Sequence, residues 1–204
     1  MFTETISAAI NNIWPMLTIF LVIVITLRIA YLRGSTKGFV FYKEMLSLIF
    51  VIYLLLLFEL VTKTTGNSGG VNLVPFTEIF RHSLSSKQFI YNVLGNIFVF
   101  IPFGYFAASY IKSKSIGQMF IVTFIASLTI ELVQFRIGRS FDIDDIILNL
   151  IGGILGFLLF VGLKAVKKHL PEMFQQDLVY NLVVIILIVV VVLYYFGISI
   201  WRIF

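Results

Sequence analysis

Six long apolar stretches decide what this chain can fold into. A helix needs roughly 20 mostly apolar residues to cross the hydrocarbon core of a bilayer. Stretches of this kind fill nearly the whole 204-residue chain, so we expect one integral membrane domain over residues 1–204. The fold class that they predict is all-α, a polytopic membrane helical bundle. The predicted helices are 13–32, 45–61, 91–111, 116–135, 143–163 and 178–200.

The amino-acid composition agrees with a place in the membrane. Hydrophobic residues make up 60% of the chain and charged residues 12%, whereas soluble domains carry about 25% charged residues. So few charges cannot cover that much apolar surface in water, which excludes soluble, fibrous and disordered classes. The chain has no cysteine, so disulfides, zinc ribbons, iron–sulfur clusters and thiol nucleophiles are excluded too.

The last two predicted helices differ in their side chains. The fifth carries Gly152, Gly153, Gly156 and Gly162, and small residues let helices approach closely in lipid, so we expect this helix at the centre. The sixth has an unbroken run of Leu, Val and Ile over 182–193. Such a run is typical of a lipid-facing helix, so 178–200 is predicted to lie at the edge of the bundle.

The distribution of Lys and Arg sets the expected orientation. These residues are more frequent in and beside the connections between helices 1–2, 3–4 and 5–6 than on the opposite side. The bias predicts both termini outside the cell, and it assigns the net charge of +5 to topology and anionic lipid, not to nucleic acid. Most of the ten acidic residues then lie on the outer side: Glu4, Glu59, Glu78, Glu131, Asp142, Asp144 and Asp145.

The connection between the second and third helices contains a further structured segment. Gly69 and Gly70 interrupt helical structure, and Pro75 disfavours helix at the residue before it. Apolar residues at 76, 79 and 80 then follow a helical spacing. We expect a short amphipathic helix here, either re-entrant or lying in the membrane interface.

Glu131 is the polar residue whose burial costs most. It lies inside the fourth predicted helix, and the i,i+3 spacing puts Gln134 on the same face. An ionisable group at the centre of a span costs about 2.5–3.5 kcal/mol on insertion scales, so it needs a partner. Glu131 is either a proton-accepting or ligand-binding carboxylate in a polar cavity, or a structural carboxylate paired with Arg136 or Arg139.

A second group of charges precedes and opens the fifth predicted helix. Asp142 is suited to cap this helix, where the free amides and the helix dipole favour acids. Capping alone does not explain the other acids, Asp144 and Asp145, beside two arginines. Asp145 and Asn149 continue into the glycines as one stripe, which suits tight packing around a polar pocket. We interpret Asp145 as a candidate site residue, and Asp142 and Asp144 as either site residues or caps.

The third predicted helix adds Asn96, which either reaches a central cavity or bonds to a neighbouring helix. Deeper in this helix, Pro102 followed by Gly104 should kink it or leave carbonyls for neighbours to satisfy. Phosphate-binding loops, nucleophile elbows and zinc-protease motifs are absent from the sequence. No cofactor is expected beyond a divalent cation such as Mg²⁺, for which Asp144 and Asp145 are the candidate ligands.

These residues, in this order, resemble the VanZ-like family. The resemblance covers about residues 69–163, which we take as the core. It rests on Asn72-Leu-Val-Pro75-Phe76, Gly95-Asn96, Phe100-Ile-Pro102-Phe-Gly104, Glu131-Leu-Val-Gln134, Arg139, Asp142, Asp144-Asp145, Asn149 and Gly152-Gly153. It implies a bacterial cell membrane and an association with resistance to the lipoglycopeptide antibiotic teicoplanin. It implies no established catalytic reaction.

The residue analysis and the resemblance point to one place. We expect a polar pocket that opens at the outer leaflet near the ends of helices 3–5, roofed by residues 72–81. The candidate ligand-binding residues are Asn72, Pro75, Glu78, Asn96, Glu131, Gln134, Arg136, Arg139, Asp142, Asp145 and Asn149. If the protein is an enzyme, the candidate catalytic residues are Glu131, Asp144 and Asp145.

Two functions fit such a pocket. In the first, the protein binds a lipid-linked cell-wall precursor or a lipoglycopeptide without turnover, and Arg139 contacts an anionic group. In the second, it is an intramembrane enzyme acting on a lipid phosphate or lipid-linked sugar, with Glu131 as general base and Asp144 and Asp145 holding an ion or water. Membrane lipids are the expected partners and nucleic acid is not. The sequence leaves the oligomeric state open.

Overall fold

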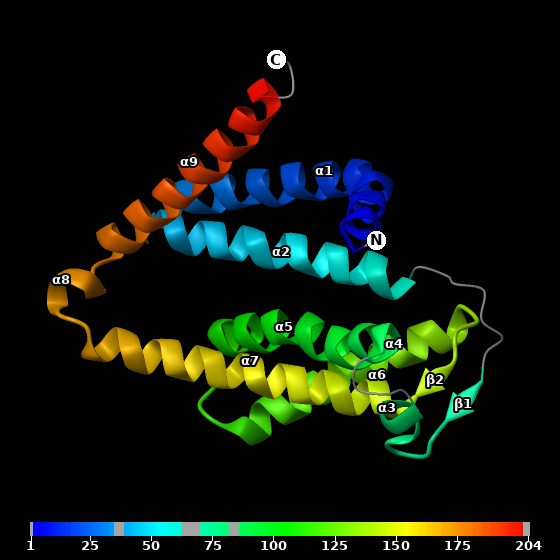
Figure 1. Ribbon diagram of the computed structural model, residues 1–204. Coiled ribbons are helices and arrows are strands. Elements are labelled where there is room, and N and C mark those ends of the chain that lie inside the picture. The colour runs from blue at the N-terminus through cyan, green and yellow to red at the C-terminus, as the bar shows by residue number, and fades with distance from the viewer. Residues whose placement is uncertain (1, 35–38, 63–69, 82–85, 202–204) are drawn as a thin grey trace.

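The computed structural model describes the backbone of residues 2–34, 39–62, 70–81 and 86–201, and the side chains within these ranges from residue 14 to residue 191. The described chain is almost entirely helical (Figure 1). Its helices are α1 (Phe2–Gly34), α2 (Phe41–Thr62), α3 (Thr77–Arg81), α4 (Lys87–Phe89), the π-helical η1 (Ile90–Leu94), α5 (Gly95–Ile111), α6 (Ile116–Arg136), α7 (Ile143–His169), α8 (Glu172–Gln175) and α9 (Asp177–Trp201).

Five of these stretches are long and apolar enough to cross a membrane, judged over the residues that the structure describes. They are Trp14–Gly34, Phe41–Thr62, Lys87–Ile111, Ile116–Arg136 and Ile143–His169. The sixth predicted span is present as α9, a helix of 25 residues. The predicted all-α polytopic membrane bundle is therefore confirmed. Several helices are longer than their apolar runs, because helical hydrogen bonding continues through polar residues such as Lys167 at the end of α7.

The helices form two groups (Figure 1). Helices α5, α6 and α7 pack together, and α1, α2 and α9 lie on one side of them, drawn above them in the figure. Contacts that join the groups include a hydrogen bond from the Tyr53 hydroxyl to the Val99 carbonyl at 2.9 Å and the stacked rings of Phe50 and Phe106 at 5.0 Å. Val99 lies in the turn before Pro102, but the carbonyl that this proline deprives of its helical amide is that of Phe98, so the expectation for Pro102 stays a prediction.

Helix α7 is the centre of the α5–α7 group, as its glycines predict. A Cβ atom on Gly156 would overlap the Ile101 carbonyl oxygen, and one on Gly152 would overlap the Ile97 carbonyl oxygen. On α5, a Cβ on Gly104 would overlap the backbone of Gly153. The two helices therefore touch backbone to backbone, which only glycine permits at these positions. Small residues at helix contacts are the usual basis of close packing in lipid.

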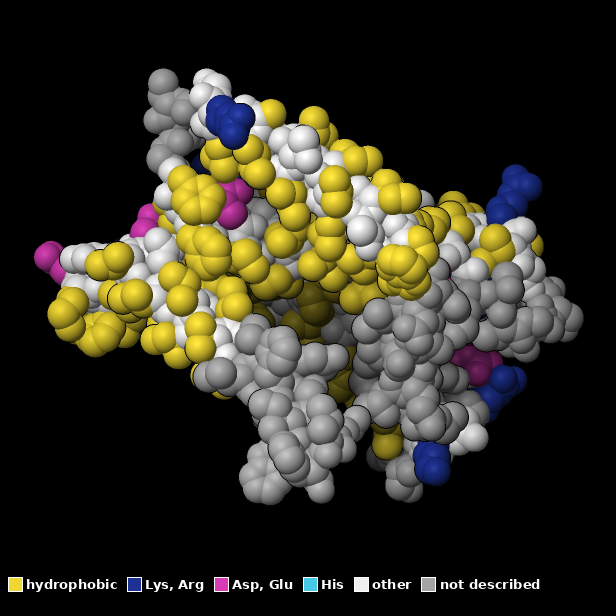
Figure 2. Space-filling view, turned by 90° about the horizontal axis from the view of Figure 1, so that it is seen from above, with side chains coloured by type: hydrophobic (Ala, Val, Ile, Leu, Met, Phe, Trp, Pro, Cys, Tyr) yellow, Lys and Arg dark blue, Asp and Glu magenta, His cyan; other side chains and the backbone are white. Residues whose placement is uncertain are grey.

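The outer surface of the bundle is apolar, as a lipid-facing surface must be. In Figure 2, hydrophobic side chains dominate the described part of one face, and Lys and Arg lie toward its margins. On α9, the run from Leu182 to Val191 is largely exposed, which agrees with the predicted peripheral position of this helix. Buried apolar side chains gather instead between α5, α6 and α7, around Ala108, Met119 and Phe157.

Two short strands lie at one end of the bundle and join the segment before α3 to the start of α7. β1 (Val71–Asn72) pairs in parallel with β2 (Phe141–Asp142), so that Val71 lies opposite Phe141 and Asn72 opposite Asp142. The short helix α3 follows β1, which confirms the helix expected after Pro75. We call the end that holds β1, β2 and α3 the strand end, and the opposite end, which holds α8 and the start of α2, the α8 end (Figure 1).

Candidate functional site

The predicted site residues gather at the strand end, where α6 and α7 meet the segment that carries β1 and α3. We call this group the polar cluster; its members are Asn72, Asn96, Glu131, Gln134, Arg139, Asp142, Asp144 and Asp145. The segment 70–81 is held against the start of α7, and its predicted role as the roof of a pocket stays a prediction. The members of the cluster are connected mainly to one another and to backbone amides.

Strand pairing brings the two halves of the cluster together. The Phe141 amide donates to the Gly70 carbonyl at 2.9 Å and extends the β1–β2 pairing. The Asn72 side chain then donates to Asp142 Oδ1 at 3.1 Å, and its own oxygen accepts from the Val74 amide at 3.1 Å. Asn72 thereby bonds across the two strands and also shapes the loop that follows β1.

Asp142 caps α7, as its position predicts. Its side chain accepts from the Asp144 amide at 2.9 Å, with Asp142 itself in an extended conformation. This residue lies in β2, outside the membrane-spanning segments. Burial raises the pKa of the Asp142 carboxyl above its ordinary value, because a charged carboxylate loses water there, and the bond from the Asp144 amide acts in the opposite direction.

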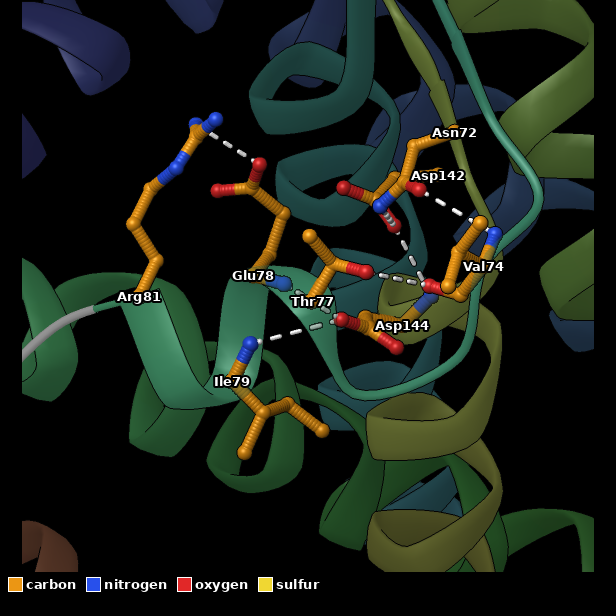
Figure 3. A network of polar contacts seen from close by, with 8 residues as sticks. All are labelled: Asn72, Val74, Thr77, Glu78, Ile79, Arg81, Asp142 and Asp144. Carbon is orange, nitrogen blue, oxygen red and sulfur yellow. Dashed lines mark hydrogen bonds and ion pairs between the residues drawn. The ribbon is translucent and has the colours of Figure 1, made fainter.

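Asp144 holds the 70–81 segment in place (Figure 3). Its carboxylate is fully buried and accepts from the amides of Phe76 at 2.5 Å, Glu78 at 2.7 Å and Ile79 at 3.3 Å. These amides open α3, so Asp144 of α7 acts as the cap of a different helix. Phe76 has a φ of 68°, a conformation that non-glycine residues rarely adopt, and its bond to Asp144 fixes it there.

Glu131 is joined to the start of α7 and to Arg139. Its side chain is 1% exposed, and Oε2 accepts from the Asp142 amide at 3.0 Å. The Gln134 amide nitrogen donates to Glu131 Oε1 at 2.9 Å, while the Gln134 oxygen accepts from Arg139 Nη1 at 2.9 Å. Among the described residues Glu131 forms no direct ion pair with Arg136 or Arg139, which was the structural alternative, and it is connected to Arg139 only through Gln134. The shared helix face predicted for Glu131 and Gln134 is confirmed.

Two further bonds join the central helices, one within the polar cluster and one deeper in the bundle. Asn96 of α5 donates to Asp145 Oδ1 of α7 at 2.5 Å, which is the bond between helices that was one of two expectations for Asn96. Asn149 of α7 donates to Ser127 Oγ of α6 at 2.9 Å, and both side chains are buried. Asp145 and Asn149 thus use their side chains to connect α7 to its two neighbours.

Three other predicted site residues lie at the edge of the polar cluster. Pro75 is exposed in the loop before α3, and Arg136 is exposed in the last turn of α6. Glu78 pairs with Arg81 at 2.7 Å on the surface of α3. The structure therefore places these three near the polar cluster but outside its buried hydrogen bonds.

Sequence reasoning missed the polar side chains deeper in α6. Thr123 and Ser127 are fully buried, and Thr123 packs against Gly153. A signal was present, because Thr123, Ser127 and Glu131 follow one another at intervals of four residues and therefore share one helix face. That face is the one that α6 buries against α7.

The carboxylates do not converge as a metal site would require. Among the described residues, no group of three or more His, Asp or Glu side chains is placed to share an ion. Asp144 directs both oxygens to amides of the α3 segment, whereas Asp145 Oδ1 bonds to Asn96. This donor set does not fit Mg²⁺ between Asp144 and Asp145.

The structure is that of a polytopic α-helical membrane protein. Its buried polar side chains gather at one end of three tightly packed helices. The VanZ/LLP1 family model matches residues 39–167, which is more than half of the chain. The chain belongs to the VanZ/LLP1 family, as its ordered motifs indicated.

A comparison with curated proteins agrees. Over 132 residues the chain is 30% identical to Protein VanZ of Enterococcus faecium, an alignment that covers 63% of this chain and 73% of that protein. No solved structure matches the chain significantly. The chain is therefore a VanZ-like cell-envelope membrane protein of a family linked to teicoplanin resistance. The helices α1 and α9 lie outside the matched residues.

Proposed function

We propose that this protein binds a lipid-linked cell-wall precursor or a lipoglycopeptide at the polar cluster, without chemical turnover. Both ligands combine an apolar chain with polar and charged groups. The observation that supports the proposal is the arrangement of the strand end. There an exposed apolar segment lies directly over buried polar groups that bond to one another, so apolar and polar surfaces adjoin as they do in these ligands. The exposed side chains are Leu73, Val74, Phe76 and Phe80, and Phe80 is 81% exposed.

The cations of the strand end supply the charge for such a ligand. Arg139 is half-buried, and its guanidinium is oriented by Gln134, while Arg136 is exposed nearby on α6. An arginine that is already oriented loses less freedom when it binds an anion. Phosphate or carboxylate groups form short, charge-assisted hydrogen bonds with guanidinium. We therefore assign the anionic part of the ligand to Arg139, with Arg136 as the second cation.

The proposal needs the strand end to face the outside of the cell, with both termini there as well. The excess of Lys and Arg at the α8 end supports this orientation. The chain has no cysteine, so single-cysteine variants report position cleanly. We expect a membrane-impermeant maleimide to label Ser140→Cys in intact cells and to label Lys114→Cys only after the membrane is opened. The reverse pattern contradicts the orientation.

Resistance is the first functional test. We would express the chain, Arg139→Gln, Glu131→Gln and the control Lys114→Gln in a susceptible Gram-positive host and measure teicoplanin and vancomycin susceptibility in parallel. We expect selective protection against teicoplanin with the wild type and the control, and loss of protection with Arg139→Gln at equal membrane abundance. Equal loss with Lys114→Gln, which lies at the other end, would argue against a role for the polar cluster.

Direct binding separates the proposal from a general effect on the envelope. Purified full-length protein in liposomes is titrated with teicoplanin and, separately, with a lipid-linked wall precursor. We expect saturable binding of at least one ligand and a loss of at least about tenfold in affinity for Arg139→Gln, the size typical of a lost hydrogen bond to a charged group. Absence of saturable binding for both ligands overturns the proposal.

The alternative is an intramembrane enzyme that acts on a lipid phosphate or lipid-linked sugar with Glu131, Asp144 and Asp145. Its support is the burial of Glu131 two hydrogen bonds from Arg139, which places an acid near a phosphate-binding cation. Against it, Asp144 has both oxygens bonded to backbone amides. Product formation from an isoprenoid or glycerolipid phosphate, abolished by Glu131→Gln, would favour this alternative over binding.

A further inference from the structure

A cavity of about 470 Å³ lies between α1 and α2, toward the α8 end and apart from the polar cluster. Its lining comes from residues 24–32 of α1, from Phe39 just before α2 and from residues 41–51 of α2, among them Val24, Leu27, Leu48 and Val51. Leu27 and Phe39 are 65% and 62% exposed, so the cavity opens to the side of the bundle. Because α1 lies outside the residues matched by the family model, one wall of this cavity is built by a part of the chain that the match does not cover.

The lining of this cavity is suited to hydrocarbon and not to water. A buried water needs two to four polar partners, and most of the lining side chains are aliphatic or aromatic. Both walls belong to helices that are long and apolar enough to span the membrane, so the open side of the cavity faces lipid. A single chain of a membrane lipid meets both conditions.

The positively charged side chain of Arg28 lies at the polar edge of the cavity. Arg28 donates from Nε to Glu44 Oε2 at 2.6 Å and from Nη2 to Glu44 Oε1 at 2.8 Å, and its guanidinium lies 5.2 Å from the centre of the Tyr31 ring. The Arg28 side chain is nevertheless 49% exposed, while that of Glu44 is 18% exposed. A guanidinium has further N–H donors beyond the two used here. Arg28 is therefore fixed in direction and still able to bind an anion.

We propose that this cavity binds one phospholipid, with a hydrocarbon chain between α1 and α2 and the phosphate on Arg28. The apolar lining matches the chain, and the exposed guanidinium at its edge matches the charge of the phosphate. Arg28 lies within a span but close to its end, where a long side chain reaches the headgroup region. The site is independent of the function proposed for the polar cluster, which lies at the other end of the molecule.

Photo-crosslinking in a defined membrane tests the site. The full-length protein is reconstituted in phosphatidylcholine vesicles that contain a small fraction of phosphatidylglycerol with a photoreactive acyl chain. After irradiation, peptide mass spectrometry locates the lipid adducts. We expect adducts to concentrate on residues 24–32 and 39–51 and to decrease when unlabelled phosphatidylglycerol is added. An even distribution of adducts over the lipid-facing helices overturns the proposal.

The ion pair itself provides the sharpest comparison. If Arg28 binds phosphate, Arg28→Gln lowers the adduct yield at the cavity at least about tenfold, whereas Glu44→Gln frees the guanidinium and keeps or raises the yield. If the pair only joins α1 to α2, both variants break the same contact and both lower the yield alike. Equal loss in the two variants therefore overturns the assignment of the phosphate to Arg28, and it does so even if each variant loosens the helices.

Filling the cavity tests the position of the hydrocarbon chain. Ser47 lines the cavity, and within the described part of the chain its hydroxyl bonds to the carbonyl of Lys43 one turn earlier, so Ser47→Phe occupies the space with little other change. Thr18→Phe is the matched control, because Thr18 is an exposed residue of α1 with the same kind of bond and does not line the cavity. We expect at least about a tenfold loss of adducts for Ser47→Phe and no change for Thr18→Phe. Unchanged adducts in both variants place the lipid elsewhere and overturn the proposal.

Discussion

The α5–α7 group and the surrounding helices α1, α2 and α9 are both apolar, yet they are held in different ways. Every residue that the structure describes as buried lies between Val93 and Phe157, within η1, α5–α7 and the connections between these helices. The described part of α1 has no buried residue, and neither has α2. In lipid, apolar surface alone does not drive helices together, so backbone contact and polar bonds decide which helices form the core.

The same contrast holds for the charged side chains. Glu131 and Asp144 are sealed inside the α5–α7 group, whereas the pairs Arg28–Glu44 and Lys43–Asp177 lie at the surface of the other helices. A buried acid that loses its partner retains the full cost of desolvation, while an exposed pair contributes little. We therefore expect the cost of substitutions to fall steeply from the α5–α7 group to the outer helices.

The largest effect is expected at the backbone contact between α5 and α7. In Gly156→Val, the new side chain overlaps the Ile101 carbonyl, so the helices must separate, and we expect a loss of at least about 3 kcal/mol of stability or failure to accumulate. Gly162→Val is the control, because nothing lies near a Cβ at that position of the same helix. Thermal unfolding in detergent and the amount of protein in membranes are the measurements. If the two variants are equally stable and equally abundant, backbone contact with α5 does not hold the α5–α7 group together more firmly than the outer helices are held.

The next effect is expected at Asp144. Asp144→Asn replaces one accepting oxygen by a donor that faces backbone N–H groups, so we expect a local loss of about 2–3 kcal/mol. Hydrogen exchange at the amides of Phe76, Glu78 and Ile79 should accelerate, while α6 and α7 keep their protection. Asp145→Asn is the control, since Asp145 bonds to Asn96 and does not contact α3. Unchanged exchange at the three amides would show that the strands alone hold this segment.

Helix α7 and its contact with α3 also show how much of the structure could be predicted from the sequence. The glycines identified α7 as the central helix, and Asp142 was recognised as its cap, because both signals are local in the sequence. The role of Asp144 was not, because its partners lie 65 to 68 residues earlier in the chain. The contact depends on the pairing of two-residue strands, which are too short to show an alternating pattern.

The predicted pocket shows a second limit. The cost of burying Glu131 correctly marked it as a residue that needs partners, but the sequence could not tell that these would be a backbone amide and Gln134. Ser127 was missed because hydroxyl side chains are common in membrane helices and cost little there. Its partner Asn149 was recognised, since an amide inside a span stands out among apolar neighbours.

A smaller effect is expected when the hydrogen bond between Asn149 and Ser127 inside the α5–α7 group is removed. Ser127→Ala leaves the Asn149 amide without its acceptor, so we expect a loss of about 1–2 kcal/mol. A double-mutant cycle with Asn149→Ala should give a coupling of about 1 kcal/mol, because only one bond joins the two side chains. The measurement is the free energy of unfolding of the four proteins. A coupling near zero would mean that helix packing, and not this bond, determines how α6 and α7 associate.

The smallest effect is expected where α9 meets α2. Lys43 bonds to Asp177 at 3.0 Å, but their side chains are 54% and 43% exposed, so water and salt screen the pair. Asp177→Asn should leave the unfolding midpoint unchanged within error at both low and high salt, since the Tyr42 amide still bonds to Asn181. Asn181→Ala is the informative partner variant, because it removes the half-buried bond instead. If Asp177→Asn alone released α9, exposed charges would be holding the outer helices as firmly as glycine contacts hold the core, and the contrast between the two groups would fail.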